Sequence, residues 1–513
     1  MAGQGQENGH VLAVDQGTSS TKALLLDASG AVVARASAPL TQTHPGPGLV
    51  EQDASAILDS VRTAITACTA GVEPATVAGV ALSTQRESAV LWDAATGLPV
   101  APLVSWQDRR GTGRAARIER AGMSGEVRRR TGLPLDPMFS ALKMAALLDA
   151  HDPARSLSRA GRLRLGTVDA FLLHHLTGQA VTEIGNASRT QLLDLTTGDW
   201  DEELLGLFGI PRATLARVVP SDGPFGQVKG VAGLGGVPVL AVLGDSHAAL
   251  FAHAGWRPGI VKATYGTGSS VMTVAGTPDV AGSVCTTIAW STKAAGKPTY
   301  AHEANIRSSG RTLTWLADLL GTTAEQLIEL AGSTGEGAEG VTLVPAFGGL
   351  GAPWWDPAAV PLLAGFGLGT GRAQLARAAV ESVAHQVADV LAAMPPATRL
   401  VADGGLSRSD TVMQLQADLS NVAVARARHH ELSAVGAAHL AGLRLGLWTG
   451  ETLERRADDD LTVFSPAWDD TRRRAAVTHW RRHLAAARDL GTSGPPQPTA
   501  TGSASSPAAH LRR

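Results

Sequence analysis

The fold is decided by a stretch near the amino terminus, Val11-Leu-Ala-Val-Asp15-Gln-Gly17-Thr18-Ser19-Ser20-Thr21-Lys22-Ala-Leu-Leu-Leu-Asp27. Its apolar ends predict two buried strands, and the first of them ends at a carboxylate. The Gly-Thr-Ser-Ser turn between them offers backbone N–H groups and hydroxyls to an anion, and Lys22 adds a positive charge. Asp15 is suited to hold Mg²⁺ beside phosphates, because Mg²⁺ prefers one or two carboxylates plus water. A plain hairpin turn is the alternative, since Asp, Gly, Thr and Ser are all common in turns.

Composition limits the class of protein. A chain of 513 residues favours two large domains, and 44% hydrophobic with 18% charged residues is typical of a folded protein. Lys plus Arg (44) nearly balances Asp plus Glu (46), so the net charge of −2 favours neither nucleic-acid nor membrane partners. Cys68 and Cys285 lie far apart, which argues against a disulfide framework or a zinc site.

The same reasoning predicts the compartment. The first residues match no signal peptide, and no uncharged apolar run reaches membrane-spanning length. We expect a cytoplasmic globular protein with no membrane insertion. The sequence leaves the oligomeric state open, a homo-oligomer included. Residues 1–9 and 491–513 are rich in Gly, Pro, Ser or Ala, and we expect both to be disordered tails.

Between these tails, short apolar segments alternate with helical patterns, which favours the α/β class. The expected helices are 55–69, 140–149, 371–393 and 409–419. The expected strands are 11–14, 21–27, 31–35, 77–83, 237–243, 260–264, 270–274, 341–344 and 400–402.

An internal echo of the opening occurs in the second half, at Ile260-Val-Lys-Ala-Thr264-Tyr-Gly266-Thr267-Gly268-Ser-Ser270. Again a strand runs into a Gly-Thr turn with hydroxyls and then into another strand. The echo predicts a duplicated domain plan, in which two facing turns grip a polyphosphate. Chance similarity of two short turns is the alternative. Neither the nucleotide motif Gly-x4-Gly-Lys-Ser/Thr nor the metalloprotease motif His-Glu-x-x-His occurs, and Gly365-Phe-Gly367-Leu-Gly369 has the wrong spacing for a dinucleotide fingerprint.

Further polar clusters follow predicted strands. Asp245 follows the apolar run 237–243 after Gly244, where it would serve as a general base or simply as a helix N-cap. His247 is expected at a surface or cap position. The adjacent Arg86 and Glu87 can donate to and accept from vicinal hydroxyls, or form a solvated turn. Trp106 would offer a flat wall to a carbon skeleton, or pack in the core.

Taken in order, these motifs resemble the FGGY carbohydrate kinases and, within them, the glycerol kinase branch. The likeness runs from about residue 11 to about residue 449, nearly all of the expected ordered chain. The segments that carry it are Val14–Thr18, Ser83–Glu87, Thr131–Pro137, Phe139-Ser140, Lys143, Gly166–Asp169, Asn186–Thr190, Gly244-Asp245, Thr264–Gly268, Pro345–Phe347, Gly349–Trp354, Ala379–Ser382, Asp403–Gly405 and Gly436–Ala438.

The resemblance implies an actin-like ATPase fold, with two duplicated ribonuclease-H-like domains flanking an ATP cleft. On this likeness an N-terminal domain covers 10–255, a C-terminal domain covers 256–449, and a helical extension covers 450–490. Asp15 would position Mg²⁺ through water, and Asp245 would be the catalytic base. The polyol would be held by Arg86, Glu87 and Trp106. The residues that would bind ATP are Thr18, Ser19, Ser20, Lys22, Thr267, Gly310, Thr314, Gly405 and Ser409.

The chain departs from the glycerol kinase pattern at six expected site positions, three for ATP and three for the substrate. On the ATP side, Lys22 stands for Arg, which loses the bidentate fork, Ser409 stands for Asn, and Thr314 stands for Gln. In the expected substrate site, Met138 stands for Tyr, Ser246 for Gln and Ser270 for Phe. Each of these three changes removes size or a polar contact.

We therefore expect an ATP-dependent kinase for a polyol or sugar larger than glycerol, such as a tetritol, a pentitol or a pentulose such as xylulose. Pockets discriminate by only about 1–3 kcal/mol per methylene, so glycerol kinase proper is the alternative. A non-catalytic ATP- or sugar-binding sensor on the same fold is the alternative from another class. Its expected signature is the loss of Asp15 or Asp245, and both residues are present.

Overall fold

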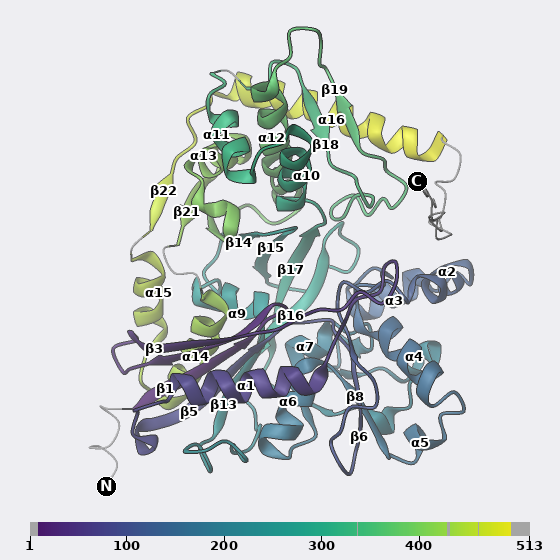
Figure 1. The fold of residues 1–513 in the computed structure, drawn as a ribbon, viewed down its shortest axis with the longest axis vertical. Coiled ribbons are helices and arrows are strands. Elements are labelled where there is room, and N and C mark those ends of the chain that lie inside the picture. Colours follow the sequence, from purple (N-terminus) through teal and green to yellow (C-terminus); the bar gives the residue numbers. More distant parts are fainter. Residues whose placement is uncertain (1–8, 336, 428–430, 460, 494–513) are drawn as a thin grey trace, which may run out of the picture.

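Two β-sheets, one from each half of the chain, organise the computed structural model in Figure 1. The structure describes residues 9–335, 337–427, 431–459 and 461–493. Within these ranges, none of the helices has both the length and the apolar character needed to cross a membrane.

The first sheet is built around the opening hairpin and has the order β13-β5-β1-β2-β3. The pairs β1–β2 and β2–β3 are antiparallel, whereas β1–β5 and β5–β13 are parallel. Both faces of β1 are buried, which explains its unbroken apolar run. The strands are β1 (His10–Gln16), β2 (Ser20–Leu26), β3 (Val32–Pro39), β5 (Val77–Thr84) and β13 (Val239–Gly244).

The second sheet has the order β16-β17-β15-β14-β20-β21-β22. Its inner strands β17-β15-β14-β20-β21 repeat the strand directions of β3-β2-β1-β5-β13, antiparallel twice and then parallel twice. The duplicated plan predicted from the two Gly-Thr turns is therefore confirmed. The strands are β14 (Ile260–Tyr265), β15 (Ser269–Ala275), β16 (Cys285–Ser291), β17 (Pro298–Ile306), β20 (Arg399–Asp403), β21 (Ala423–Arg426) and β22 (Thr462–Phe464).

Helices cover both sheets, and an insertion between β5 and β13 carries most of the smaller elements (Figure 1). The helices are α1 (Ala54–Cys68), α2 (Thr112–Arg120), α3 (Ser124–Thr131), α4 (Ser140–His151), α5 (Ser156–Arg159), α6 (Val168–Thr177), α7 (Ile184–Ser188), α8 (Glu202–Phe208), α9 (Asp245–Ala252), α10 (Gly310–Leu320), α11 (Ala324–Gly332), α12 (Arg372–Ala392), α13 (Asp410–Ser420), α14 (Leu432–Leu445), α15 (Gly450–Asp458) and α16 (Asp470–Ser493), with short 3₁₀ turns at η1 (Pro74–Thr76), η2 (Arg212–Thr214) and η3 (Gly405–Arg408). The remaining short strands are β4 (Glu51–Gln52), β6 (Val90–Asp93), β7 (Leu103–Val104), β8 (Leu163–Gly166), β9 (Val181–Glu183), β10 (Leu193–Asp194), β11 (Asp199–Trp200), β12 (Arg217–Val219), β18 (Thr342–Val344) and β19 (Leu362–Ala364).

The first sheet is packed on both sides. Helix α1 lies against β2 and β3, and its N-cap Asp53 accepts hydrogen bonds from the N–H groups of Ser55 and Ala56. On the other face α14 contacts β1, β5 and β13, although α14 belongs to the second half of the chain. The β1 side chains Val11 and Ala13 share one apolar cluster with α14. The two halves are thus joined through a shared core.

The segment 450–490, which we expected to be a helical extension, also contains a strand. It contains α15 and most of α16, but β22 lies between them and pairs antiparallel with β21 at the edge of the second sheet. The run from 462 to 464 is too short to show a clear strand period in the sequence. Helix α16 continues to Ser493, into the expected tail at 491–513. The other residues of that tail, 494–513, lie outside the described residues, as do 1–8 of the expected tail at 1–9.

Helix α14 crosses α9 at very short range, and this crossing generates a stability prediction. A Cβ added at Gly436 of α14 would lie 1.7 Å from the carbonyl oxygen of Ala248 in α9. We expect Gly436→Ala to lower the free energy of unfolding by about 2 kcal/mol or more, because overpacking outweighs the gain in helix propensity. The matched control is Gly450→Ala in α15, where no atom of the described residues beyond the neighbouring backbone lies within 4 Å of the added Cβ. Thermal unfolding should show a lower Tm for the first variant alone, and equal Tm values would contradict the packing account.

Candidate functional site

The first Gly-Thr turn and its carboxylate lie together at the carboxyl end of β1, the central strand of the first sheet. Asp15 pairs with Lys22 of β2 and with Ser83 of β5, whose Oγ donates to Asp15 Oδ1 at 2.9 Å. In the turn, the Gly17 N–H donates to the carbonyl of Ser20 at 3.1 Å. The exposed Ser19 and the half-buried Ser20 leave two hydroxyls at the tip of the hairpin. The carboxyl end of β1 therefore presents a carboxylate, an ammonium and hydroxyls in one place.

Trp106 lies against this turn rather than apart from it. Its indole Nε1 donates to Thr18 Oγ1 at 3.1 Å. Thr18 was predicted to handle phosphate and Trp106 to hold the polyol, and the structure brings the two side chains into contact.

Asp15 faces a second carboxylate. Burial first, and then the negative charge of Asp245, raise the pKa of Asp15 to about 6, although Ser83 and Lys22 act in the opposite direction. A cation beside a buried carboxylate stabilises its ionised form. Mg²⁺ fits this donor set, because it takes one or two carboxylates and completes its shell with water and phosphate oxygens. Among the described residues, no group of three His, Cys, Asp or Glu side chains could hold a metal unaided.

The second Gly-Thr turn lies against the start of α10. The Gly266 N–H donates to the carbonyl of Gly268, and the Gly310 N–H donates to the carbonyl of Gly266, both at 2.9 Å. A Cβ at Gly310 would lie 2.7 Å from Gly266 O, so only glycine permits this approach. Thr267 and Gly310 are therefore brought together, with the exposed Thr314 one turn further along α10.

The other predicted ATP residues follow β20, the neighbour of β14 in the second sheet. Gly405 begins η3, and Ser409 is the N-cap of α13, where its Oγ accepts a hydrogen bond from the Val412 N–H at 3.3 Å. Gly404 has a φ of 91°, and a Cβ there would lie 2.5 Å from Tyr265 O. The backbone after β20 thus lies directly on β14. The roles of these residues in nucleotide binding stay predictions.

Asp245 is the first residue of α9, and the N-cap is Gly244 rather than Asp245. Its Oδ1 accepts hydrogen bonds from the Ser246 N–H at 2.6 Å and from Arg86 Nε at 3.1 Å. The Asp245 side chain is 37% exposed, whereas that of Arg86 is only 5% exposed. The buried Arg86 thus orients the Asp245 carboxylate, which remains accessible from solvent. A general base needs such access to a substrate hydroxyl.

Arg86 has a partner that the sequence did not reveal. Its Nη1 and Nη2 donate to Glu303 Oε2 and Oε1 at 2.9 and 2.8 Å, a bidentate pair with Glu303 fully buried. Glu303 belongs to β17 of the second sheet, so this pair connects the two halves of the chain. A carboxylate in the middle of a strand shows no local signal of such a role.

Arg189, just beyond α7, completes a buried charge network. It donates to Glu87 Oε1 at 2.6 Å and lies 3.1 Å from Glu303 Oε2. Burial alone would raise the pKa of Glu303, but the charges of Arg189 and Arg86 outweigh it and hold that pKa well below its usual value. Glu87 adopts a left-handed backbone with φ 62°, an uncommon conformation that tends to occur at functional sites.

His247 is buried in this network, not exposed or capping as expected from the sequence. Its Nε2 lies 3.4 Å from Arg86 Nη1. Burial and the charge of Arg86 hold the pKa of His247 well below its usual value, so the ring is neutral. The sequence does not predict the burial of His247, because only tertiary packing decides which face of α9 points inward.

Met138 is carried by a segment that a buried lysine fixes. Lys143 of α4 donates to the carbonyls of Pro137 and Phe139, both at 2.9 Å, and to that of Met138. Burial lowers the pKa of Lys143 to about 7, although the nearby charge of Glu87 raises it. Three accepting carbonyls use all three N–H groups of the ammonium form. The lysine therefore sets the position of Met138.

The last two predicted substrate residues are Ser246 and Ser270. Ser246 follows Asp245 in α9 and is half-buried. Ser270 is in β15, and its buried Oγ has no hydrogen-bond partner among the described residues. A buried hydroxyl without a partner points to a group that the protein itself does not supply.

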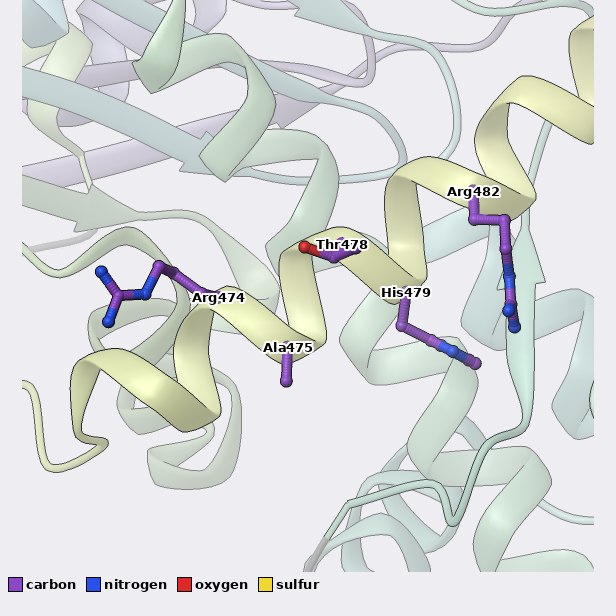
Figure 2. Close-up of a pocket in the computed structure, with 5 residues that line it drawn as sticks. All are labelled: Arg474, Ala475, Thr478, His479 and Arg482. Carbon is purple, nitrogen blue, oxygen red and sulfur yellow. The ribbon is translucent and has the colours of Figure 1, made fainter.

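A separate hollow of about 360 Å³ lies on α16, lined by Arg474, Ala475, Thr478, His479 and Arg482. Figure 2 shows Arg474 and Arg482 at opposite ends of the labelled stretch of α16, with their side chains extending in different directions. Its cationic groups therefore do not converge on one ligand atom. None of the predicted site residues lines this hollow.

Comparison with known proteins gives a consistent result over nearly the whole chain. The family models for the N-terminal and C-terminal domains of the FGGY family of carbohydrate kinases match residues 10–252 and 261–445. A glycerol kinase of Aromatoleum aromaticum is 43% identical, with 93% of this chain and 99% of the relative covered. An apulose kinase of Pectobacterium atrosepticum is 42% identical, with 93% and 98% covered. The crystal structure of Plasmodium falciparum glycerol kinase with ADP is 25% identical and has a TM-score of 0.88, with 93% and 98% covered.

The buried network generates a second stability prediction. We expect Glu303→Gln to lower the free energy of unfolding by about 3–5 kcal/mol, because it leaves the Arg86 and Arg189 guanidiniums buried with no carboxylate between them. The matched control is Glu451→Gln, which removes the carboxylate of an exposed pair with Arg455. That change should cost at most about 0.5 kcal/mol. Urea unfolding measures both, and a small loss for Glu303→Gln would show that the network does not bear on stability.

Proposed function

The chain belongs to the FGGY family of carbohydrate kinases, phosphotransferases with an alcohol as acceptor, and we propose that this member phosphorylates a polyol or sugar larger than glycerol. The proposed substrates are a tetritol, a pentitol or a pentulose such as xylulose, phosphorylated at a terminal hydroxyl. The observation that carries the proposal is the buried hydroxyl of Ser270, which has no hydrogen-bond partner in the described part of the chain and stands where the glycerol kinase pattern has a phenylalanine.

Asp245 is proposed as the base of this reaction. It is the most accessible group of the charge network and is the first residue of a helix, where the helix dipole favours a negative charge. A carboxylate is a weak base, but phosphoryl transfer passes through a loose transition state in which the proton leaves late, so positioning matters most. Arg86 holds the carboxylate in place, and Arg86 with Glu87 and Trp106 would contact the substrate hydroxyls.

The family uses ATP, and the two Gly-Thr turns are proposed to bind its phosphates from opposite halves of the chain. Thr18, Ser19 and Ser20 offer hydroxyls, Lys22 offers charge, and Thr267 offers the matching hydroxyl from the second turn. Asp15 would hold Mg²⁺ through water. When bound, Mg²⁺ supplies charge neutralisation on the phosphate oxygens.

Three small or flexible residues support the larger substrate. Met138, Ser246 and Ser270 replace the tyrosine, glutamine and phenylalanine of the glycerol kinase pattern. Losing the phenyl group leaves room that a three-carbon substrate does not fill. Glycerol kinase proper is the second candidate, because one of the most similar relatives carries that name. A sensor without activity is disfavoured, since Asp15 and Asp245 are both present and face each other.

We propose the cytoplasm as the compartment of this reaction. Both cysteines, Cys68 and Cys285, are buried free thiols, which supports a reducing environment.

A substrate panel tests the proposed specificity. We expect kcat/KM for at least one of erythritol, threitol, xylitol, ribitol, xylulose and ribulose to exceed that for glycerol by about tenfold or more, since one additional well-made contact is worth that factor. Coupled detection of ADP measures each rate. If glycerol gives the highest kcat/KM of the panel, the larger-substrate proposal is wrong and the chain is a glycerol kinase.

Asp245→Asn tests the base. We expect kcat to fall by about 10²–10⁴-fold, because the variant keeps the shape of the site but cannot accept the proton. Binding of ATP, measured by titration calorimetry, should stay unchanged. The matched control is Asp470→Asn, at the first residue of α16, which should leave kcat as it was. Near-normal turnover by Asp245→Asn would exclude Asp245 as the base.

A further inference from the structure

Polar side chains form a row across the second sheet, on the face opposite its hydrophobic core. The register aligns Asp403 with Thr264, Thr264 with Ser270, and Ser270 with Asn305. The alternate residues of β17, Ala304 and Ile306, belong to the core. Because side chains alternate along a strand, Asn305 lies on the same face as Glu303.

Glu303 fixes where this row lies relative to the predicted substrate residues. It holds Arg86 in a bidentate pair, and Arg86 in turn contacts Asp245. Asn305 is two residues further along β17, about 7 Å from Glu303 between Cα atoms. A short polyol held at Arg86 and Asp245 would not need Asn305, whereas a longer chain that ran along β17 would reach it.

The side chain of Asn305 has hydrogen-bonding capacity to spare. Its Nδ2 lies 4.0 Å from Met138 Sδ, and thioether sulfur is a weak acceptor. Its neighbour Ser270 has a buried Oγ without a partner among the described residues. Half-buried Asn305 and Ser270 thus present donors and acceptors side by side, which is the combination that a hydroxyl requires, since a hydroxyl both donates and accepts.

Arg307, the first charged residue after Asn305 in the sequence, already has partners within the protein. Arg307 donates to Asp136 Oδ2 at 2.9 Å and to the carbonyl of Gly348 at 2.7 Å, and Asp136 also accepts from the Met138 N–H. The guanidinium is therefore not available to a carboxylate or phosphate on the substrate. Gly351 approaches the Asn305 carbonyl so closely that a Cβ there would lie 2.3 Å from it, so this segment packs directly on β17 beyond the polar row.

We propose that Asn305, acting with Ser270, binds the hydroxyls on the carbons remote from the phosphorylated one and so selects an uncharged polyhydroxylated chain longer than three carbons. This inference rests on the proposed function, and it adds a residue that selects for the far end of the substrate. With glycerol bound, the Asn305 amide and the Ser270 hydroxyl have no substrate partner, which disfavours glycerol relative to the longer chain.

Asn305→Leu tests the assignment, because leucine has nearly the same size but makes no hydrogen bonds. We expect kcat/KM for the best four- or five-carbon substrate to fall by about tenfold or more, and kcat/KM for glycerol to change by less than about threefold. Ser270→Ala is the second variant. The Ser270 hydroxyl has no partner among the described residues, so its removal should leave the fold intact and lower kcat/KM for the longer substrate in the same selective way.

The control on the same strand is Thr299→Ala, at the opposite end of β17, which should alter neither rate. The assignment is overturned if Ser270→Ala and Asn305→Leu lower the two rates equally or leave both unchanged while the wild-type enzyme prefers the longer substrate. A wild-type enzyme that prefers glycerol overturns the larger-substrate proposal itself, and this inference with it. The wild-type panel therefore separates the two failures before any variant is compared.

Discussion

The buried ion pair between Arg86 and Glu303 is the interaction on which the rest of the site depends. Arg86 comes from the segment after β5 in the first sheet, and Glu303 comes from β17 in the second, so two parts of the chain far apart in sequence meet at fully desolvated charges. Such a pair is stable only with bidentate geometry and further neutralising contacts, which Arg189 and Asp245 supply. The same guanidinium that holds the halves together also orients the proposed base. The Arg86–Glu303 contact therefore both joins the two sheets and helps to orient the carboxylate of Asp245.

The packing of the two sheets and of helix α14 fixes the positions of Arg86 and Glu303. The inner strands of both sheets repeat one order of directions, so each half presents a Gly-Thr turn at the corresponding sheet edge. Helix α14 of the second half lies on the first sheet and crosses α9 where Gly436 meets Ala248, which fixes the helix that begins at Asp245. The shared core and the shared ion pair thus act in the same direction. Together they place Asp245 at the end of β13, in contact with Arg86.

The parts of the fold and of the site that depend on a few neighbouring residues could be predicted from the sequence. The strand-turn-strand pattern at Asp15 and its echo at Thr267 predicted the hairpins and the duplication, because apolar runs and glycine turns are encoded within a few residues. Glu303 and Arg189 could not be found that way, since a buried charge is stabilised by partners that only the tertiary structure brings near. His247 was misjudged for the same reason, as helix periodicity alone does not say which face of α9 is inward. The strand β22 was missed because three residues carry no period.

A double-mutant cycle on catalysis tests most directly whether Glu303 acts through Arg86. The kcat/KM of Arg86→Lys, Glu303→Gln and the double variant would be measured on the best substrate of the wild-type enzyme. If the pair works as one unit, the double variant is within about threefold of the worse single variant, and the coupling free energy exceeds about 1 kcal/mol. If the two effects simply multiply, Glu303 and Arg86 contribute independently, and the ion pair does not organise the site.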